Sequence, residues 1–363
     1  MIHISKPYIN YQEINSVTKV MRSGNLTQGG LVKKLEKIIC KLCNAKYAIA
    51  TNNGTSALHA ALIACGVSKG DEVITTSLSF IASTNAIIMA GATPVFADVD
   101  EKTFNIDPTI IEKKITKKTK AILAVNLFGQ TADYDKINKI AKQNNLLVIE
   151  DAAQSINASY GKKKSGNLAD ISCFSFYATK NITSAEGGMI ITNSKKFYEK
   201  AKILINHGQE NKQYNYVRLG YNYRLTDIQA AIALEQMKKI DFITRKRRSI
   251  AKIYTAGLKD LKGLTAPFES PNVFHVFNQY TIKISDKFPV SRNNFIKKLA
   301  KENIQTKIYY PQPLFSIPHL KQYDKKFKMP IVSNIVKEVV SLPIYPALTI
   351  QEINFIIKTI RNI

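Results

Sequence analysis

Short apolar runs alternate with helical patterns along the chain up to about residue 245. A strand-like run leads into a helical pattern within residues 47–66 and again within residues 70–87. Further strand-like runs lie at 92–100, 120–128, 146–149, 171–177 and 189–192. Strands that alternate with helices indicate a mostly parallel sheet whose faces are covered by helices. The pattern therefore predicts an α/β fold.

Helical periodicity predicts the elements around this sheet. The first residues are extended, and a helix near Gln12–Arg22 follows them. The polar, glycine-rich residues 23–30 are either a linker or a loop over an active site. Other helices are predicted at about 31–42, 108–114 and 195–206, and one long helix over 228–258.

The pattern changes at about residue 260 to a mixture of strands and helices. A strand is predicted over 276–284, a helix over 293–301, a strand-like run over 339–345 and a helix at the end. We therefore predict two domains. Residues 1–245 form a large domain with an N-terminal arm, and residues 246–363 form a smaller α+β domain.

One lysine, Lys180, lies where the apolar run that begins at Ile171 breaks, among serine, threonine, asparagine and aromatic residues. Apolar residues resume after Gly187-Gly188, so Lys180 lies between two predicted strands. Burial lowers the pKa of a lysine because the charged form loses its hydration. Such a lysine can attack a carbonyl carbon and form a Schiff base. A lysine in an exposed loop is the alternative.

A carboxylate, Asp151, ends the preceding predicted strand, Leu146-Leu-Val-Ile-Glu-Asp. In an open α/β sheet, ligands bind at the carboxyl ends of the strands. An acid there, together with a Schiff-base lysine downstream, suits pyridoxal phosphate, since the acid keeps the pyridine nitrogen protonated. For Asp151 alone, a cap on the next helix is the alternative, so the pairing with Lys180 is what favours the cofactor.

Two further stretches suit the same cofactor. Asn53-Gly54-Thr55-Ser56 places glycine, free backbone N–H groups and hydroxyls at a predicted helix N-terminus, which is a ready anion site. Ordinary capping by Thr and Ser is the alternative. Phe80 falls at a strand–helix junction, where an aromatic ring could stack on a flat cofactor or simply belong to the core.

The composition excludes several classes of protein. The chain has 363 residues, 45% hydrophobic and 22% charged, with no apolar run long enough to cross a membrane. Met1–Pro7 lacks the basic and apolar segments of a secretory signal. Four cysteines fit a reducing cytoplasm. Cys40 and Cys43 have metal-ligand spacing, but they lie in an amphipathic helical pattern with no second Cys or His pair, so we predict no metal.

The formal net charge of +25 allows a nucleic acid, a membrane surface or an anionic small substrate as partner. The lysines are scattered, mostly on polar faces of predicted helices, and no basic tail or aromatic–basic alternation is present. We therefore predict no nucleic acid and no membrane partner. A diffuse positive field still favours a substrate that carries a diphosphate.

Together these stretches resemble the DegT-type (DegT/StrS) sugar aminotransferases, over nearly the whole chain. The motifs are Asn-Gly-Thr-Ser-Ala-Leu-His, Glu-Asp-Ala-Ala-Gln, Phe-Ser-Phe-Tyr-Ala-Thr-Lys-Asn, Glu-Gly-Gly-Met and Gly-Tyr-Asn-Tyr-Arg. The resemblance implies the fold-type-I architecture of pyridoxal phosphate aminotransferases. It also implies transfer of an amino group, usually from L-glutamate, to a keto group of a nucleotide-linked sugar, by ping-pong transamination in surface polysaccharide synthesis.

Matched position by position, Lys180 resembles the family's Schiff-base lysine and general base. Asp151 resembles the partner of the pyridine nitrogen, and Gln154 the residue near the ring hydroxyl. Phe80 matches the aromatic residue that stacks on the ring.

Other matched positions concern the phosphate, the dimer and the substrate. Gly54, Thr55 and Ser175 resemble the phosphate ligands. Asn222 matches a phosphate ligand that comes from the neighbouring subunit, which implies a homodimer with shared sites. The matched substrate-binding positions are Arg224, Tyr309 and Tyr310.

The sequence departs from the family at two positions. Several members have Trp where this chain has Asn25, and some have His where it has Tyr309. Both positions lie in predicted substrate regions, so the sugar is not identified. The Ser184-Ala-Glu-Gly-Gly188 element resembles members that aminate C4 more than those that aminate C3.

Two other functions are compatible with the same scaffold. Pyridoxal phosphate-dependent sugar dehydratases resemble this chain but replace the lysine with His, whereas Lys180 is present here. A basic regulatory or nucleic-acid-binding protein is supported only by the charge.

Overall fold

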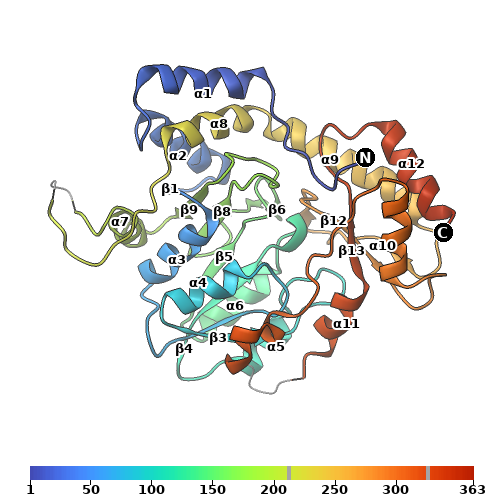
Figure 1. The fold of residues 1–363 in the computed structure, drawn as a ribbon. Helices are drawn as coiled ribbons and strands as arrows, with labels where there is room; N and C mark the ends of the chain where they lie inside the picture. The colour runs from blue at the N-terminus through green and yellow to red at the C-terminus, as the bar shows by residue number, and fades with distance from the viewer. Residues whose placement is uncertain (211–213, 324–327) are drawn as a thin grey trace.

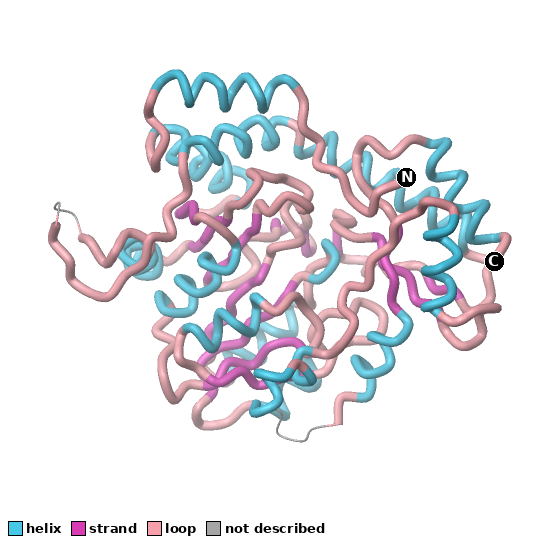
Figure 2. Tube along the Cα trace, viewed as in Figure 1, coloured by secondary structure: helices cyan, strands magenta, loops and turns pink. Residues whose placement is uncertain are grey.

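The computed structural model describes residues 1–210, 214–323 and 328–363. A seven-stranded sheet lies at the centre, in the order β1-β9-β8-β5-β4-β2-β3. β9 is antiparallel to both of its neighbours, and the other neighbouring pairs are parallel (Figures 1 and 2). The predicted α/β fold with a mostly parallel sheet is confirmed. The strands of this sheet are β1 (Tyr47–Thr51), β2 (Glu72–Thr76), β3 (Thr93–Ala97), β4 (Thr119–Val125), β5 (Leu147–Asp151), β8 (Ile171–Ser175) and β9 (Gly188–Thr192).

Helices cover both faces of this sheet. Successive side chains of a strand point to opposite faces, so Leu123 and Ile149 pack with α3 and α4, whereas Ile122 and Val148 pack against α6. The helices of this part of the molecule are α1 (Tyr11–Ser23), α2 (Gly30–Cys43), α3 (Gly54–Ala64), α4 (Ala82–Met89), α5 (Pro108–Ile111), α6 (Tyr134–Gln143), α7 (Lys195–Leu204) and α8 (Asp227–Lys238), with 3-10 helices η1 (Glu112–Lys114) and η2 (Leu127–Gly129).

A second, smaller lobe holds both chain termini (Figure 1). Its antiparallel sheet, β10-β12-β13, packs with α9, α10 and α12 around one apolar cluster. Its elements are α9 (Ile240–Leu258), β10 (Leu264–Thr265), β12 (Tyr280–Ile284), α10 (Arg292–Lys301), β13 (Val339–Leu342) and α12 (Ile350–Arg361). The predicted boundary at residue 245 falls inside α9, and it stays a prediction.

Two chain segments cross between the lobes. Ile2 packs in the cluster of the small lobe, and its backbone pairs with Ile304. In the other direction, Leu320 and Val332 pack in the cluster of the main sheet. The second segment contains η3 (Leu314–Ser316), η4 (Pro318–Tyr323) and α11 (Pro330–Glu338). A third, short sheet consists of β11 (Val273–Phe274), β6 (Ser159–Tyr160) and β7 (Lys163–Lys164).

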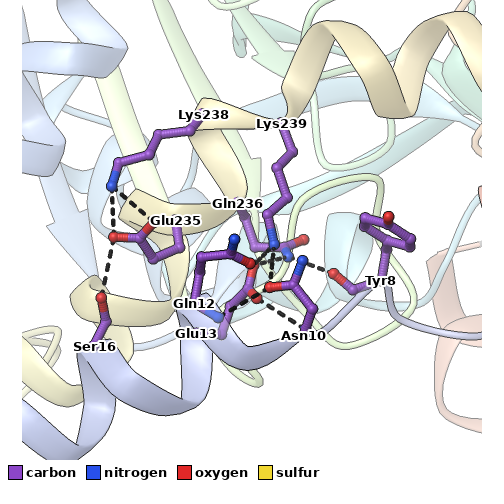
Figure 3. A network of polar contacts seen from close by, with 9 residues as sticks. All are labelled: Tyr8, Asn10, Gln12, Glu13, Ser16, Glu235, Gln236, Lys238 and Lys239. Carbon is purple, nitrogen blue, oxygen red and sulfur yellow. Dashed lines mark hydrogen bonds and ion pairs between the residues drawn. The ribbon is translucent and has the colours of Figure 1, made fainter.

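The single long helix predicted over 228–258 is wrong. Lys239, with φ −104° and ψ 1°, separates α8 from α9. Its ammonium donates to the carboxylate of Glu13 and to the side chain of Asn10, so the break is fixed from outside the helix (Figure 3). The N-terminus of α8 is as predicted, since Thr226 caps it and Gln229 completes a capping box.

The strand predicted over 276–284 begins later, at Tyr280. Val276 and Gln279 donate their backbone N–H groups to the carbonyls of Gly129 and Phe128. These bonds tie residues 276–279 to η2 of the main lobe, so the segment leaves the strand. Within the described ranges, no helix is long and apolar enough to cross a membrane.

Candidate active site

The carboxylate of Asp151 lies at the carboxyl end of β5, on the face that α3 and α4 cover. It is only 4% exposed. Oδ2 accepts a hydrogen bond from Ser83 Oγ at 2.7 Å, and Oδ1 accepts from the Ala153 N–H at 3.1 Å. Burial raises the pKa of Asp151, while these two bonds and the charge of Lys180 oppose the shift. The alternative role as a helix cap is not what the structure shows, because no helix follows β5 directly.

Lys180 lies in the connection between β8 and β9, in a turn closed by its own N–H to the Tyr177 carbonyl at 2.9 Å. The side chain is partly exposed. Desolvation lowers the pKa of Lys180 to about 8, and the nearby charge of Asp151 limits the shift. The predicted pairing of a lysine with a low pKa and a buried carboxylate is therefore present. An amine with this pKa is a competent nucleophile near neutral pH.

The next residue, Asn181, fixes the lysine turn to the rest of the molecule. Its amide donates to the Val276 carbonyl at 3.1 Å, and its oxygen accepts from Asn278 Nδ2 at 3.0 Å. Both partners belong to the segment that joins the two lobes. The position of Lys180 therefore depends on how the lobes are joined.

Gly54 and Thr55 form the N-terminus of α3, which Asn53 caps through the Ser56 N–H at 2.8 Å. The first two N–H groups of a helix have no intrahelical acceptor. A Cβ added to Gly54 would lie 2.9 Å from Ser175 Cβ, so only glycine lets the helix end approach the Ser175 hydroxyl. The backbone N–H groups and this hydroxyl form an anion cradle.

The glycine pair after Lys180 has a related packing role. A Cβ on Gly188 would lie 2.4 Å from the carbonyl oxygen of Asn53. Glycine therefore lets β9 pass directly beside the turn that begins α3, which keeps the cradle in place.

Gln154, Tyr310 and Phe80 lie together beside Asp151. Gln154 Oε1 accepts from the Phe128 N–H at 2.7 Å, and its Nε2 donates to the Tyr310 hydroxyl at 3.3 Å. The rings of Phe80 and Tyr310 are 6.2 Å apart. Phe80 is 56% exposed, so it is not a core residue, and its ring is free to contact a ligand. Tyr310 thus belongs with the residues predicted for the cofactor as well as with the predicted substrate region.

Arg224 and Asn222 lie at the edge of the main sheet, beyond β1. Asn222 is exposed, and its carbonyl accepts from Asn52 Nδ2 at 3.4 Å, next to the anion cradle. Arg224 Nη1 donates to Asn206 Oδ1 at 2.6 Å. Tyr309, by contrast, lines a small cavity with Thr179 and residues of the small lobe.

Two buried serines beside Asp151 were not predicted from the sequence. Ser83, which donates to Asp151, accepts or donates a bond of 2.9 Å to Ser79 Oγ. Their four-residue spacing places both on one side of the turn into α4. That spacing is the signal by which they could have been found.

These residues fit pyridoxal phosphate. The chain brings together an amine with a lowered pKa, a buried carboxylate with free acceptor capacity, an exposed aromatic ring and a cradle that excludes even a Cβ. Among the described residues, no cluster of His, Cys, Asp or Glu is suited to a metal ion.

The chain matches known proteins over nearly its whole length. Residues 7–361 match the DegT/DnrJ/EryC1/StrS aminotransferase family. The chain is 40% identical over 368 residues to a "Pleiotropic regulatory protein" of Geobacillus stearothermophilus, covering 100% of this chain and 97% of the relative. It is 37% identical over 367 residues to a "GDP-perosamine synthase" of Caulobacter vibrioides, covering 100% and 98%.

Among solved structures, the chain resembles Helicobacter pylori PseC, an aminotransferase involved in the biosynthesis of pseudoaminic acid. The TM-score is 0.94, the identity is 30%, and the match covers 99% of this chain and 98% of that one.

Proposed function

Because the chain belongs to the DegT/DnrJ/EryC1/StrS aminotransferase family, we propose that it transfers an amino group from L-glutamate to a keto group of a nucleotide-linked sugar. The chain is a sugar aminotransferase, and its cofactor is pyridoxal phosphate. The observation that supports the proposed roles is the electrostatic interaction of desolvated Lys180 with buried Asp151, together with the close approach of Gly54 to Ser175 at the α3 N-terminus.

Bound pyridoxal phosphate supplies an electron sink for the pair of electrons left when a proton leaves the amino acid α-carbon. Lys180 would hold the cofactor covalently, and its free amine would accept and return that proton. Its pKa of about 8 suits both directions of transfer near neutral pH. Asp151 would accept a hydrogen bond from the ring nitrogen and stabilise its positive charge, and its burial would strengthen that interaction.

The remaining predicted residues orient the cofactor. The N–H groups of Gly54 and Thr55 and the Ser175 hydroxyl bind the phosphate. Gln154, whose Oε1 accepts a hydrogen bond from the Phe128 N–H, would lie near the ring hydroxyl. Phe80 covers the ring face.

The sugar substrate carries a nucleotide diphosphate and a keto group, and we favour C4 over C3 because of the Ser184-Ala-Glu-Gly-Gly188 element. The name of the Caulobacter relative supports a nucleotide-linked sugar. The formal charge of +25 also favours a diphosphate. Arg224, Tyr309 and Tyr310 are the proposed substrate-binding residues.

The working form is a homodimer with shared sites. Apolar residues are exposed on the hairpin that projects from the body between α7 and α8 (Figure 1), namely Tyr216 at 57%, Val217 at 48% and Leu219 at 77%. Such a surface on a projecting segment fits a second copy of the chain. Asn222, at the base of this hairpin, then reaches the phosphate of the neighbouring subunit.

The cofactor absorbance of the purified protein, recorded before and after addition of L-glutamate, tests this proposal. Glutamate alone should convert the band of the lysine-bound cofactor to that of the aminated cofactor. Lys180→Ala should abolish the first band and lower turnover by several orders of magnitude. Lys164→Ala, which removes a partly buried lysine bonded to Asn157, is the matched control and should behave as the wild type. Turnover by Lys180→Ala would disprove the assignment.

A further inference from the structure

Two buried serine hydroxyls lie between the surface turn of Phe80 and the carboxylate of Asp151. Ser79 is 3% exposed and Ser83 is 1% exposed. Ser83 Oγ donates to Asp151 Oδ2 at 2.7 Å, so its hydrogen is used. In the contact of 2.9 Å between the two hydroxyls, Ser79 is then the donor and Ser83 the acceptor. The three side chains form one directed relay that ends on the carboxylate.

The relay leaves the carboxylate ready for one more donor. A carboxylate accepts about four hydrogen bonds, and among the described residues Asp151 receives one on each oxygen, from Ser83 and from the Ala153 N–H. Neighbouring Glu150 differs, because Asn126, Ser165, Ser172 and backbone N–H groups surround it. Free acceptor capacity on a buried, oriented carboxylate is what a ring N–H requires.

The same turn carries Phe80, the proposed ring-stacking residue. Ser79 and Phe80 are adjacent in the sequence. Ser83 lies about one helical turn after Ser79, in the first turn of α4. The turn therefore positions a ring contact and the orientation of Asp151 through the same few residues.

We infer that Ser83, supported by Ser79, is a positioning residue that holds Asp151 ionised and oriented toward the pyridine nitrogen of the cofactor. The inference rests on the proposed role of Asp151. Burial raises the pKa of Asp151, and the hydrogen bond from Ser83 opposes that rise. Without this bond the pKa would be higher, so the carboxyl would become neutral at a higher pH. Among the described residues, the other titratable groups that interact electrostatically with Asp151 are Lys180, Cys173, Tyr310 and, from the opposite side of the sheet, Tyr134, and none of them is changed.

The test measures the dissociation constant of pyridoxal phosphate from the holoprotein across a pH series. Ser83→Ala should weaken binding at least about tenfold, or about 1.4 kcal/mol. Its loss of affinity at acid pH should begin about one pH unit higher than in the wild type, since one pKa unit corresponds to a similar free energy. Ser83→Thr keeps the hydroxyl and should restore both properties.

Ser77→Ala is the matched control. Ser77 is buried in the same β2–α4 connection, and its hydroxyl has no hydrogen-bond partner in the structure. Removal of this hydroxyl should change neither the cofactor affinity nor the pH at which affinity is lost on the acid side. If Ser83→Ala does not fold, Ser79→Ala provides a second test, because it removes only the hydroxyl that donates to Ser83. Its loss of affinity at acid pH should also begin at a higher pH than in the wild type, by a smaller amount.

Four outcomes are decisive. Wild-type affinity and pH dependence in Ser83→Ala would overturn the inference, as would a Ser83→Thr variant as weak as Ser83→Ala. Asp151→Asn separates the two proposals. If Asp151→Asn binds the cofactor as well as the wild type, the proposed role of Asp151 itself fails. If Asp151→Asn binds weakly while Ser83→Ala does not, only the relay fails.

Discussion

At the scale of single residues, two adjacent carboxylates show how position decides chemistry. Glu150 and Asp151 point to opposite faces of β5 because side chains alternate along a strand. Glu150 is fully buried and receives hydrogen bonds from Ser165 and Ser172 at 2.7 Å each, so it organises the polypeptide around it. Asp151 keeps capacity for a ligand, and its charge interacts with that of Lys180.

The pH dependence of Lys180 reactivity follows from its surroundings. In the cofactor-free protein, acylation of Lys180 by a small neutral reagent should rise with a midpoint near pH 8, because only the free amine reacts and its pKa is about 8. Asp151→Asn removes the negative charge that stabilises the ammonium, so the midpoint should fall below that of the wild type. Mass spectrometry of the peptide that contains Lys180 measures the modified fraction.

Asp135→Asn, a change at an exposed acid of α6, is the control and should leave this midpoint unchanged. A midpoint near the ordinary lysine value of 10.5 would show that Lys180 is not desolvated.

The residues proposed to carry the chemistry could be selected from the sequence, whereas those proposed to position them could not. Lys180 and Asp151 stand out because a lysine between apolar runs and an acid at a strand end are both unusual. Ser83 does not stand out, since its partner is 68 positions away and serine is common in such turns. The contact between Gln154 and Tyr310 spans 156 positions and depends on the return of the chain to the main lobe.

At the scale of elements, the break between α8 and α9 is held by a buried ion pair. Lys239 Nζ lies 2.6 Å from Glu13 Oε1, and the two side chains are 16% and 2% exposed (Figure 3). Gln236 and the Asn10 N–H also donate to Glu13. The network joins the start of α1 to the point where the chain turns toward the small lobe.

Adjacent lysines in this network provide a matched comparison. Lys239→Ala should lower the free energy of unfolding by about 2–3 kcal/mol, because Glu13 stays buried without its cation. Lys238→Ala removes a surface pair with Glu235, in which the lysine is 68% exposed, and should cost less than about 1 kcal/mol. Urea unfolding at pH 7 measures both.

The effect of Lys239→Ala on the free energy of unfolding should depend on pH, because it involves the carboxylate of Glu13. Burial raises the pKa of Glu13, but the bonds from Lys239, Asn10 and Gln236 outweigh it and bring the pKa below the ordinary value of 4.5. A lowered pKa stabilises the fold above the unfolded-state pKa, and the stabilisation is lost as the pH falls through the folded-state pKa. The difference between Lys239→Ala and the wild type should therefore shrink below about pH 4.5. A difference that is the same at acid and neutral pH would contradict this role of the pair.

Elements with strong local patterns were predictable, and those that depend on tertiary contacts were not. The strands of the main sheet follow from their apolar runs. The residue at the α8–α9 break is Lys239 and not glycine or proline, so the local sequence does not mark the break. Residues 276–279 look like a strand but bond to η2 instead.

At the scale of the whole molecule, the two lobes share segments. Ile2 and the residues around Ile304 close the small lobe, whereas Leu320 and Val332 return to the main sheet. The sequence alone could not predict which lobe each segment packs against, because this depends on contacts between apolar residues that are far apart in the chain. The joining segments include Asn278, which bonds to the neighbour of Lys180.

Dimer formation with shared sites can be tested by complementation. Lys180→Ala and Asn222→Ala should each be inactive or nearly so, if Asn222 binds the phosphate of the neighbouring subunit. Co-expressed together, the two variants should recover about a quarter of the wild-type activity, because about half of randomly paired dimers are mixed and each mixed dimer has one intact site. The exposed side chain of Asn222, with its backbone held by Asn206 and Asn52, is consistent with a role outside its own subunit. If Asn222 instead acts within its own chain, every site in a mixed dimer lacks one residue. Activity then stays at the level of the single variants, even though size-exclusion chromatography shows a dimer.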